Sequence, residues 1–346
     1  MGEHATQSHG SRHMVRRLLA TLAIMSAVCG GFLTGSAIAA EPAKCNTGVD
    51  KVCYAGYNAA GLKQIADDLS EKGKGSTYYA AMEKNLTDGV KGTLTLSDGS
   101  NLPFRLIGIL HDDKADGSGR KAGLTFMAWN ALPKAYAMNN SHTNNGGWRD
   151  SLLRNQMNNG EIWNQFPTDF QNNVTTVLKQ TNNMAYGSTV GSSASATADK
   201  VWLVSYRELV PTLYDGWKTS GGFQALNQEG SQYEYFHGKV TNNWSGNSIL
   251  SGIYKTVSGS TPLGANGGYW WERSPNPNNN NNFLQVNSNG DPSYNNNANN
   301  RYSVVPDSSY QKLTSDRPVA QWVKASRRGR GYGRMRGPSK NGLRVK

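Results

Sequence analysis

The spacing of apolar residues predicts several short helices and strands rather than one long regular element. Apolar positions from Leu62 to Leu69 recur at helical spacing, which predicts an amphipathic helix over 59–71 that ends at the glycines following it. Alternating apolar positions in 93–96 and 102–109 flank an Asp-Gly pair, which is the pattern of a β-hairpin. The first part of the chain therefore combines a helix with antiparallel strands.

The middle of the chain has two further helical patterns and a buried strand. We predict a short helix over 148–157 and a second over 166–178, with Pro167 near its first turn. The apolar run 201–204 predicts a buried strand, and the Ser-Tyr-Arg-Glu sequence after it fits a helix capping box. Residues 211–265 are aromatic, Gly-rich and irregular. We interpret them as packed loops whose Tyr and Trp side chains are core or loop anchors, and not as a second domain.

An Asn-rich stretch near the C-terminus is the feature around which the rest is organised. In Asn276–Asn300, 13 of 25 residues are Asn, yet apolar residues interrupt the run. Phe283–Val286 fits a short strand, and Asn289-Gly290 is a strong turn pair. The alternative, a uniform solvated or prion-like Asn tract, does not account for this embedded strand. The pattern indicates apolar strand residues that stay fixed, with polar positions between them that vary.

A specific family resemblance begins at the same place. The segment GGYWWERSP, then clustered Asn, then F-x-x-V-N-S-N-G, resembles the variable region of diversity-generating retroelement target proteins. Those proteins are similar to C-type lectins. In that system a reverse transcriptase copies a template and alters adenines, so that Asn codons become codons for many other residues. The resemblance implies a variable region over 272–306.

The resemblance also implies which residues vary and which hold the frame. The scaffold residues would be Trp270, Trp271, Phe283 and Val286. The candidate ligand-binding, variable positions are Asn276, Asn278, Asn279, Asn280, Asn281, Asn282, Asn287, Asn289, Asp291, Tyr294, Asn295, Asn296, Asn297, Asn299 and Asn300.

A second, wider resemblance implies the same kind of fold. The segments KAGLTFMA, GGWRDSLLRNQMN, V-x-K-Q-T, ADKVWLVSYREL and G-G-x-x-W-x-R-S-P follow one another between 121 and 275. In this order they are similar to an uncharacterised bacterial family that is itself C-type-lectin-like. The implied architecture is an α+β, C-type-lectin-like fold with short antiparallel sheets, two helices and long loops. A small N-terminal helical segment would precede it.

We expect four parts along the chain. They are a leader with a signal peptide (1–39), an N-terminal helical segment (40–84), the C-type-lectin-like domain (85–310) and a basic tail (311–346). The leader has a basic start, an apolar run and a small-x-small cleavage pattern at 37–39, which predicts export to a secreted or cell-surface location. Cys45 and Cys53 lie close together after the leader, and in an exported chain a small-loop disulfide is the expected interpretation.

The positive charge belongs to the two ends of the chain. Of the formal net charge of +12, residues 1–40 contribute +2 and residues 324–346 contribute +9, which leaves +1 for residues 41–323. This near-neutral balance argues against nucleic acid as a partner of the folded part, so the expected partner is a protein or cell-surface ligand. The tail lacks apolar periodicity and is expected to be disordered. It either contacts nucleic acid or another anionic surface, or is a solvated extension.

The sequence contains no catalytic or metal-binding pattern that we recognise. His111, His142 and His237 are the histidines outside the leader, and none has the spacing of a metal pair. The run Asp112–Gly117 fails as a calcium loop because Lys114 stands at a ligand position, so we interpret it as a turn. We therefore expect no enzyme activity, no cofactor and no metal.

Two further expectations concern the Asn-rich region. We expect Glu272 and Arg273 to pair with each other at the base of the variable surface. The alternative function is a fixed glycan-binding lectin or adhesin of the bacterial envelope, with the Asn amides as hydrogen-bond partners of the sugar.

Overall fold

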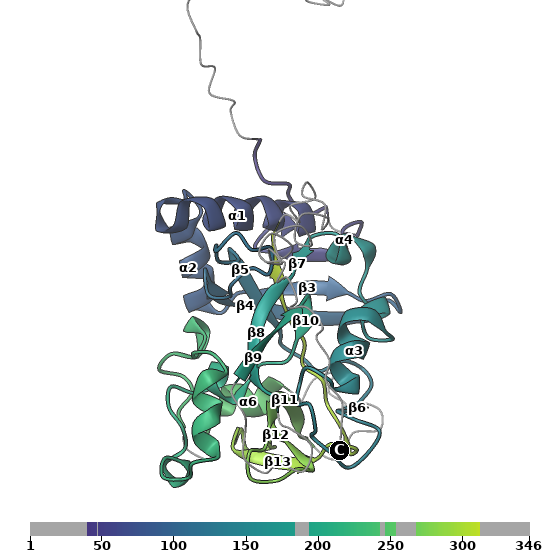
Figure 1. The fold of residues 1–346 in the computed structure, drawn as a ribbon. Helices are drawn as coiled ribbons and strands as arrows, with labels where there is room; N and C mark the ends of the chain where they lie inside the picture. The colour runs from purple at the N-terminus through teal and green to yellow at the C-terminus, as the bar shows by residue number, and fades with distance from the viewer. Residues whose placement is uncertain (1–39, 47, 184–193, 243–245, 254–267, 312–346) are drawn as a thin grey trace, which may run out of the picture. The chain divides into compact units, whose positions relative to one another are not determined.

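The structure, a computed structural model, describes residues 40–46, 48–183, 194–242, 246–253 and 268–311. The described residues from Glu41 onwards belong to one compact unit. The fold is α+β, with antiparallel sheets and few helices, as the sequence predicts (Figure 1). The predicted leader (1–39) and nearly all of the basic tail lie outside the described residues.

The largest sheet contains eight strands, and all its pairings are antiparallel. It contains the predicted hairpin, because β3 pairs with β4 across the Asp-Gly turn. In the order of pairing its strands are β10 (Val201–Trp202), β15 (Asp307–Tyr310), β5 (Leu124–Ala128), β4 (Asn101–Ile109), β3 (Lys91–Thr95), β1 (Val52–Tyr54) and β2 (Tyr57–Asn58), with β7 (Val174–Thr175) also paired to β15.

This sheet joins the beginning and the end of the described chain. Strands β1 and β2 come from the segment 40–84, and β15 follows directly after the Asn-rich region. Aromatic rings pack between these distant segments: Phe126 lies edge-to-face with Tyr54 (4.9 Å between centroids) and with Tyr310 (5.5 Å). The Asn-rich region is therefore bounded on its C-terminal side by a strand of the central core.

The predicted first helix is confirmed as α1 (Ala59–Lys72). The side chain of Asn58 accepts a hydrogen bond from the Gly61 amide at its start, and Gly73 follows its end. The other helices are α2 (Tyr79–Asp88), α3 (Leu152–Asn159), α4 (Thr168–Gln171), α5 (Tyr206–Leu209) and α6 (Ser248–Ile253), with 3-10 turns η1 (Gly73–Gly75), η2 (Trp163–Gln165), η3 (Asp215–Trp217), η4 (Phe223–Gln228) and η5 (Glu234–Phe236). No helix of the described residues combines the length and the apolar character needed to cross a membrane.

The helix predicted over 166–178 is wrong. Only α4 is helical, and the chain then forms β7 and β8 (Val177–Asn182), which pairs with β9 (Ala194–Asp199). The run Val-Thr-Thr-Val at 174–177 explains the difference, since β-branched side chains are stiff at χ1 and favour strands once a partner strand is present.

Two other boundaries differ from the prediction. Helix α3 begins at Leu152 rather than near Trp148, because Ser151 caps it by accepting a hydrogen bond from the Arg154 amide. The strand predicted over 201–204 is limited to β10. The capping box after it is confirmed, with Ser205 and Glu208 capping α5 reciprocally.

The Asn-rich region forms a separate three-stranded antiparallel sheet. It consists of β11 (Trp270–Pro275), β12 (Asn282–Val286) and β13 (Tyr294–Asn297), in that order. The strand predicted at Phe283–Val286 is thus confirmed. Figure 1 shows this sheet at the opposite end of the described unit from α1. A short pairing of β14 (Arg301–Tyr302) with β6 (Tyr136–Ala137) leads from it back towards the main sheet.

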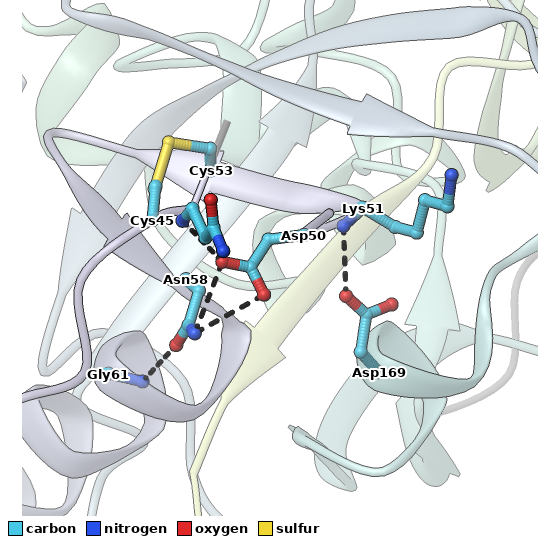
Figure 2. The surroundings of a disulfide bond; sticks show 8 residues. Cys45, Asp50, Lys51, Cys53, Asn58, Gly61 and Asp169 are labelled. Carbon is cyan, nitrogen blue, oxygen red and sulfur yellow. Dashed lines mark hydrogen bonds between the residues drawn. A yellow bond between two sulfur atoms is a disulfide. The ribbon is translucent and has the colours of Figure 1, made fainter. Parts of the chain in front are cut away.

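Cys45 and Cys53 form the predicted disulfide, with their Cα atoms 5.7 Å apart (Figure 2). The loop that it closes is also held by Asp50, whose carboxylate accepts hydrogen bonds from the Asn46 amide (2.6 Å) and the Asn58 side chain (3.4 Å). This arrangement fixes the entry into α1.

Candidate functional site

The predicted variable positions line the loops and the outer strand of the three-stranded sheet. Exposed side chains are those of Asn278, Asn280, Asn289, Tyr294 and Asn299. Partly buried side chains are those of Asn279, Asn281, Asn282, Asn287, Asn295, Asn296, Asn297 and Asn300. Two predicted positions are buried: Asn276 is 6% exposed and Asp291 is 2% exposed.

The buried side chain of Asn144 contacts the main chain of the loop between β11 and β12 at several points. The Nδ2 atom of Asn144 donates to the main-chain oxygens of Asn276 (3.2 Å), Asn279 (2.6 Å) and Asn282 (2.8 Å). The Asn144 amide also donates to the Asn280 oxygen (2.9 Å). Every residue type has a main-chain oxygen, so these bonds do not depend on which side chains the loop has.

Some Asn side chains in this region shape the backbone rather than point to solvent. Asn276 and Asn279 each accept a hydrogen bond from the amide two residues further on, at 2.9 and 2.7 Å. Asn287 accepts from the amides of Asn289 and Asp291, and Asp291 caps Ser293. Such local turns favour Asn and Asp specifically.

Other Asn side chains have no such role. Five Asn side chains make no hydrogen bond to the residues that the structure describes, although some of their main-chain amides do. They are those of Asn280, Asn281, Asn289, Asn297 and Asn299. The Asn-rich region thus contains turn-forming positions, positions whose side chains bond to another described side chain, and positions without a side-chain hydrogen bond to the described residues. The composition of the sequence did not distinguish these sets.

The predicted turn at Asn289-Gly290 is confirmed, and it requires glycine. The Gly290 amide donates to the Asn287 oxygen (3.0 Å), and Gly290 has φ +81°. A Cβ atom at Gly290 would lie 2.3 Å from the main-chain oxygen of Asn247. Asn247 in turn donates from its side chain to the Gly290 oxygen (3.1 Å).

A line of aromatic rings runs from the surface into the core. Tyr294 is 40% exposed and stacks on Tyr269 with 5.4 Å between ring centroids. Tyr269 contacts Tyr302 edge-to-face, and Tyr302 contacts Trp271 in the same way. Tyr294 therefore presents a partly exposed ring that is supported by the aromatic rings packed behind it.

The four predicted scaffold residues, Trp270, Trp271, Phe283 and Val286, are all fully buried. Trp271 donates from its indole nitrogen to the Tyr136 oxygen (2.9 Å). The frame beneath the Asn-rich loops is therefore apolar.

Arg273 of β11 connects this frame to the central part of the molecule. It is fully buried and pairs with both carboxylate oxygens of Glu208 in α5. It also donates to the oxygens of Leu203 (2.8 Å) and Glu229 (2.9 Å) and to the hydroxyl of Thr181 (3.1 Å). Because all three guanidinium nitrogens have acceptors, the buried charge is well compensated.

The expected pairing of Glu272 with Arg273 is wrong. Neighbouring strand residues point to opposite faces of a sheet, so Arg273 reaches Glu208 instead. Glu272 is buried, and neither of its carboxylate oxygens has a hydrogen-bond partner among the described residues. Burial, together with the nearby Glu229 and Asp291 carboxyls, raises the pKa of Glu272 well above its usual value.

Asp112, the first residue of the polar loop 112–117, has its carboxylate buried in the core. Lys179 lies 2.6 Å from Asp112 and 2.5 Å from Glu208, so it bridges the loop to the Arg273 pair. Burial opposes ionisation of Asp112, but the charges of Lys179 and His111 outweigh it and lower the pKa of Asp112 to about 2. Asp112 is therefore a partner of Lys179 in the core. No group of three or more His, Cys, Asp or Glu residues suited to a metal ion occurs in the described ranges.

Glu229 lies beside this network and behaves differently. It accepts hydrogen bonds from the Asn182 amide (2.8 Å) and from the Ser274 hydroxyl of β11. Burial raises the pKa of Glu229 to about 7, although Ser274 and Arg273 act in the opposite direction. Asp307 is also fully buried, and its pKa is raised well above the usual value by burial and by Glu208.

A second buried cluster joins other motifs of the sequence. Asp199 accepts hydrogen bonds from the Trp148 indole (2.9 Å) and the Arg154 guanidinium (2.6 Å). These residues come from the GGWRDSLLRN and ADKVW segments. The motifs are therefore core contacts between distant segments.

These contacts define the molecule as an α+β protein whose Asn-rich sheet is joined by buried charges to helix α5 and to the β8–β9 pair. A sequence model of the family described as "Domain of unknown function (DUF6273)" matches residues 122–319, which is more than half of the chain, and the protein belongs to this family. The matched range contains Trp148, Lys179, Glu208 and Arg273. No curated protein and no solved structure matches the chain.

Proposed function

We propose that this chain is an exported, C-type-lectin-like display protein that binds protein or cell-surface ligands through its Asn-rich face. The side chains of this face are diversified by a retroelement, and the chain has no catalytic role. The chemistry of recognition is then supplied by loop side chains on a fixed support.

The observation that carries this proposal is the way Asn144 holds the β11–β12 loop. Its bonds reach only main-chain oxygens, so the loop keeps its support when its exposed side chains are exchanged. Substitution of exposed residues away from such bonds usually changes stability by no more than about 0.5 kcal/mol. A surface of this kind tolerates diversification.

The composition of the face supports a binding role. The side chains of Asn278, Asn280 and Asn299 are exposed, and Tyr294 adds an aromatic surface that stacks on Tyr269. Amide and Tyr side chains are typical of recognition surfaces, because Asn adapts its hydrogen bonds while Tyr buries area at small entropic cost. The Cys45–Cys53 disulfide supports export, since such bonds persist in oxidising compartments.

Sequencing the DNA beside the gene tests the diversification step. We expect a near-copy of the segment encoding 272–306 that differs at adenines, next to a reverse transcriptase gene. A neighbourhood with neither of these would contradict diversification.

Two protein libraries test the structural part of the proposal. The first randomises Asn280, Asn281, Asn297 and Asn299, whose side chains make no hydrogen bond to described residues. The matched second library randomises the turn-forming Asn276, Asn279, Asn287 and Asp291. We expect most members of the first library to be folded and protease-resistant, and some to bind a chosen target protein. Equal losses of folded protein in both libraries would contradict a tolerant face.

A fixed glycan-binding role is the second candidate. It is favoured by the exposed Tyr294 ring beside amide groups, because sugars present both apolar faces and hydroxyls. Binding of the unvaried chain to a glycan array, lost in Tyr294→Ala, would favour this candidate over diversification.

A further inference from the structure

A groove of about 440 Å³ lies far along the chain from the Asn-rich residues. It is formed by one face of α2, by η1, by the end of β4 and by η5. Its volume is within the range of about 300–1,000 Å³ found for small-molecule sites. The other cavity of note, about 20 Å³ among the aromatic residues of the core, has no room for such a ligand.

The apolar floor of this groove depends on an unusual backbone. Leu110 has φ +57°, in the left-handed region that non-glycine residues seldom adopt. A register shift at Leu106 and Gly108 precedes it in β4. Consecutive strand residues normally point to opposite faces, yet Ile109 and Leu110 both line the groove, together with Leu86 of α2. The irregular strand end thus gathers aliphatic side chains on one side.

One wall of the groove has a carboxylate in a fixed position. Glu234 Oε1 lies 3.0 Å from His111 Nδ1, and His111 also stacks near the Tyr233 ring. Glu234 Oε2 is buried and has no hydrogen-bond partner among the described residues, so it does not face the groove. Burial lowers the pKa of His111, but the hydrogen bond with Glu234 and the nearby Asp112 and Glu234 carboxylates outweigh this effect and raise it.

Helix α2 and η1 contribute one carboxylate and one ammonium group that have no ion-pair partner among the described residues. Glu83 of α2 and Lys74 of η1 line the groove, and neither forms an ion pair with a described residue. The Lys74 ammonium lies 5.6 Å from the Tyr79 ring instead. Nearby lysines differ, because Lys72 pairs with Asp68 and Lys84 pairs with Asp88. Among the described residues, the groove therefore has one carboxylate (Glu83) and one ammonium (Lys74) without an ion-pair partner, beside the aliphatic side chains of its floor.

We propose that this groove binds a small aliphatic zwitterion, namely a leucine-like amino acid or a short apolar peptide. The ligand ammonium has three donors, which suit the exposed Glu83 carboxylate and the Thr87 hydroxyl. The ligand carboxylate suits Lys74, and the aliphatic side chains suit Leu86 and Leu110. A free amino acid and a peptide share this chemistry.

Isothermal titration of the full chain with leucine, dileucine, N-acetyl-dileucine and dileucine amide tests the proposal. We expect saturable binding of dileucine or leucine, and the tighter of the two identifies the source. We expect the acetylated and amidated compounds to bind about tenfold or more weakly, because each loses one charge-assisted contact. Equal binding of the blocked compounds, or no binding by any of the four, overturns the proposal.

Matched variants locate the site. Glu83→Gln and Lys74→Met change exposed residues, so the fold is retained, and each is expected to weaken binding about tenfold. Lys84→Met, on the same helix but paired with Asp88, is expected to leave binding unchanged. Tyr294→Ala changes the Asn-rich face and not the groove, so it is also expected to leave binding of the ligand unchanged. Unchanged affinity in Glu83→Gln overturns the assignment.

Discussion

Arg273 and Glu208 are 65 residues apart in the sequence, yet they form a fully buried pair with bonds to both carboxylate oxygens. Arg273 belongs to the strand that precedes the Asn-rich loops, and Glu208 caps a helix of the central region. The pair therefore fixes the position of the three-stranded sheet from its non-variable side.

Removing the Arg273 charge should destabilise the protein strongly. Arg273→Met leaves the Glu208 carboxylate buried without its main partner, which typically costs about 3–5 kcal/mol. Arg273→Lys keeps the charge but loses the two-pronged geometry, so we expect an intermediate loss. Urea unfolding measures both. Arg120→Met, at an exposed position, serves as the control and should stay within about 0.5 kcal/mol. A stable Arg273→Met protein would show that the pair is not needed.

Glu229 should make stability fall as the pH rises from about 4.5 to about 7. Its pKa is raised in the folded state, so between these values the folded state holds a proton that the unfolded chain has lost. The contribution is fully present below the unfolded value and is lost as pH passes the folded value, with a size on the order of 3 kcal/mol.

Urea unfolding at pH 5 and pH 7.5 checks this expectation for Glu229. We expect Glu229→Gln to reduce the slope without abolishing it, because one titrating group is gone while Glu272 and Asp307, whose pKa values are also raised, still contribute. The control is Glu161→Gln, which removes a half-exposed carboxylate paired with Lys134 and should keep the slope. The same slope in all three proteins would mean that Glu229 does not control it.

The disulfide should stabilise the fold by restricting the unfolded chain. The loop between Cys45 and Cys53 is short, with a sequence separation of 8, so the expected contribution is about 2–3 kcal/mol. Thermal melts with and without reductant should differ for the natural chain. They should coincide for the double variant Cys45→Ser, Cys53→Ser. A natural chain that melts at the same temperature in both conditions would contradict this estimate.

Asn144→Ala should loosen the β11–β12 loop while the rest stays folded. It removes a side-chain amide whose two hydrogens serve three main-chain oxygens, at about 0.5–1.5 kcal/mol for each hydrogen, so we expect a loss of about 1–3 kcal/mol. Hydrogen exchange across 276–282 should accelerate. Asn280→Ala is the matched control, since the Asn280 side chain is exposed and makes no hydrogen bond to described residues. Equal exchange in the two variants would remove Asn144 from its supporting role.

Sequence periodicity correctly predicted those elements whose local spacing of apolar residues matches the side that they bury in the folded protein. Helix α1 has an apolar stripe and a side-chain cap, and β12 has apolar residues inside an otherwise polar run. The helix predicted over 166–178 was wrong because the apolar spacing of this segment fits a helix as well as a strand. Pairing of the segment with distant strands makes its second half a strand. No local pattern reports such a partner.

The chemistry of the region was only partly visible in the sequence. Composition located the Asn-rich face, but it did not show that Asn276 and Asp291 point inwards or that Asn144 lies beneath the loop. Arg273 was visible as a charged residue, but its neighbour Glu272 was the nearer candidate partner along the chain. Contacts across 65 to 138 residues depend on the tertiary fold.

The close approach of Gly290 to the Asn247 oxygen has a consequence at the level of the gene. Every glycine codon begins with two guanines, and the codons of Trp, Phe and Val likewise have no adenine in the two positions that define them. A polymerase that miscopies adenines therefore cannot place a side chain at Gly290 or alter Trp270, Phe283 or Val286. Under the proposed mechanism, the genetic code would protect Gly290 and the apolar frame, whereas the turn-forming Asn276, Asn279 and Asn287 would stay open to change.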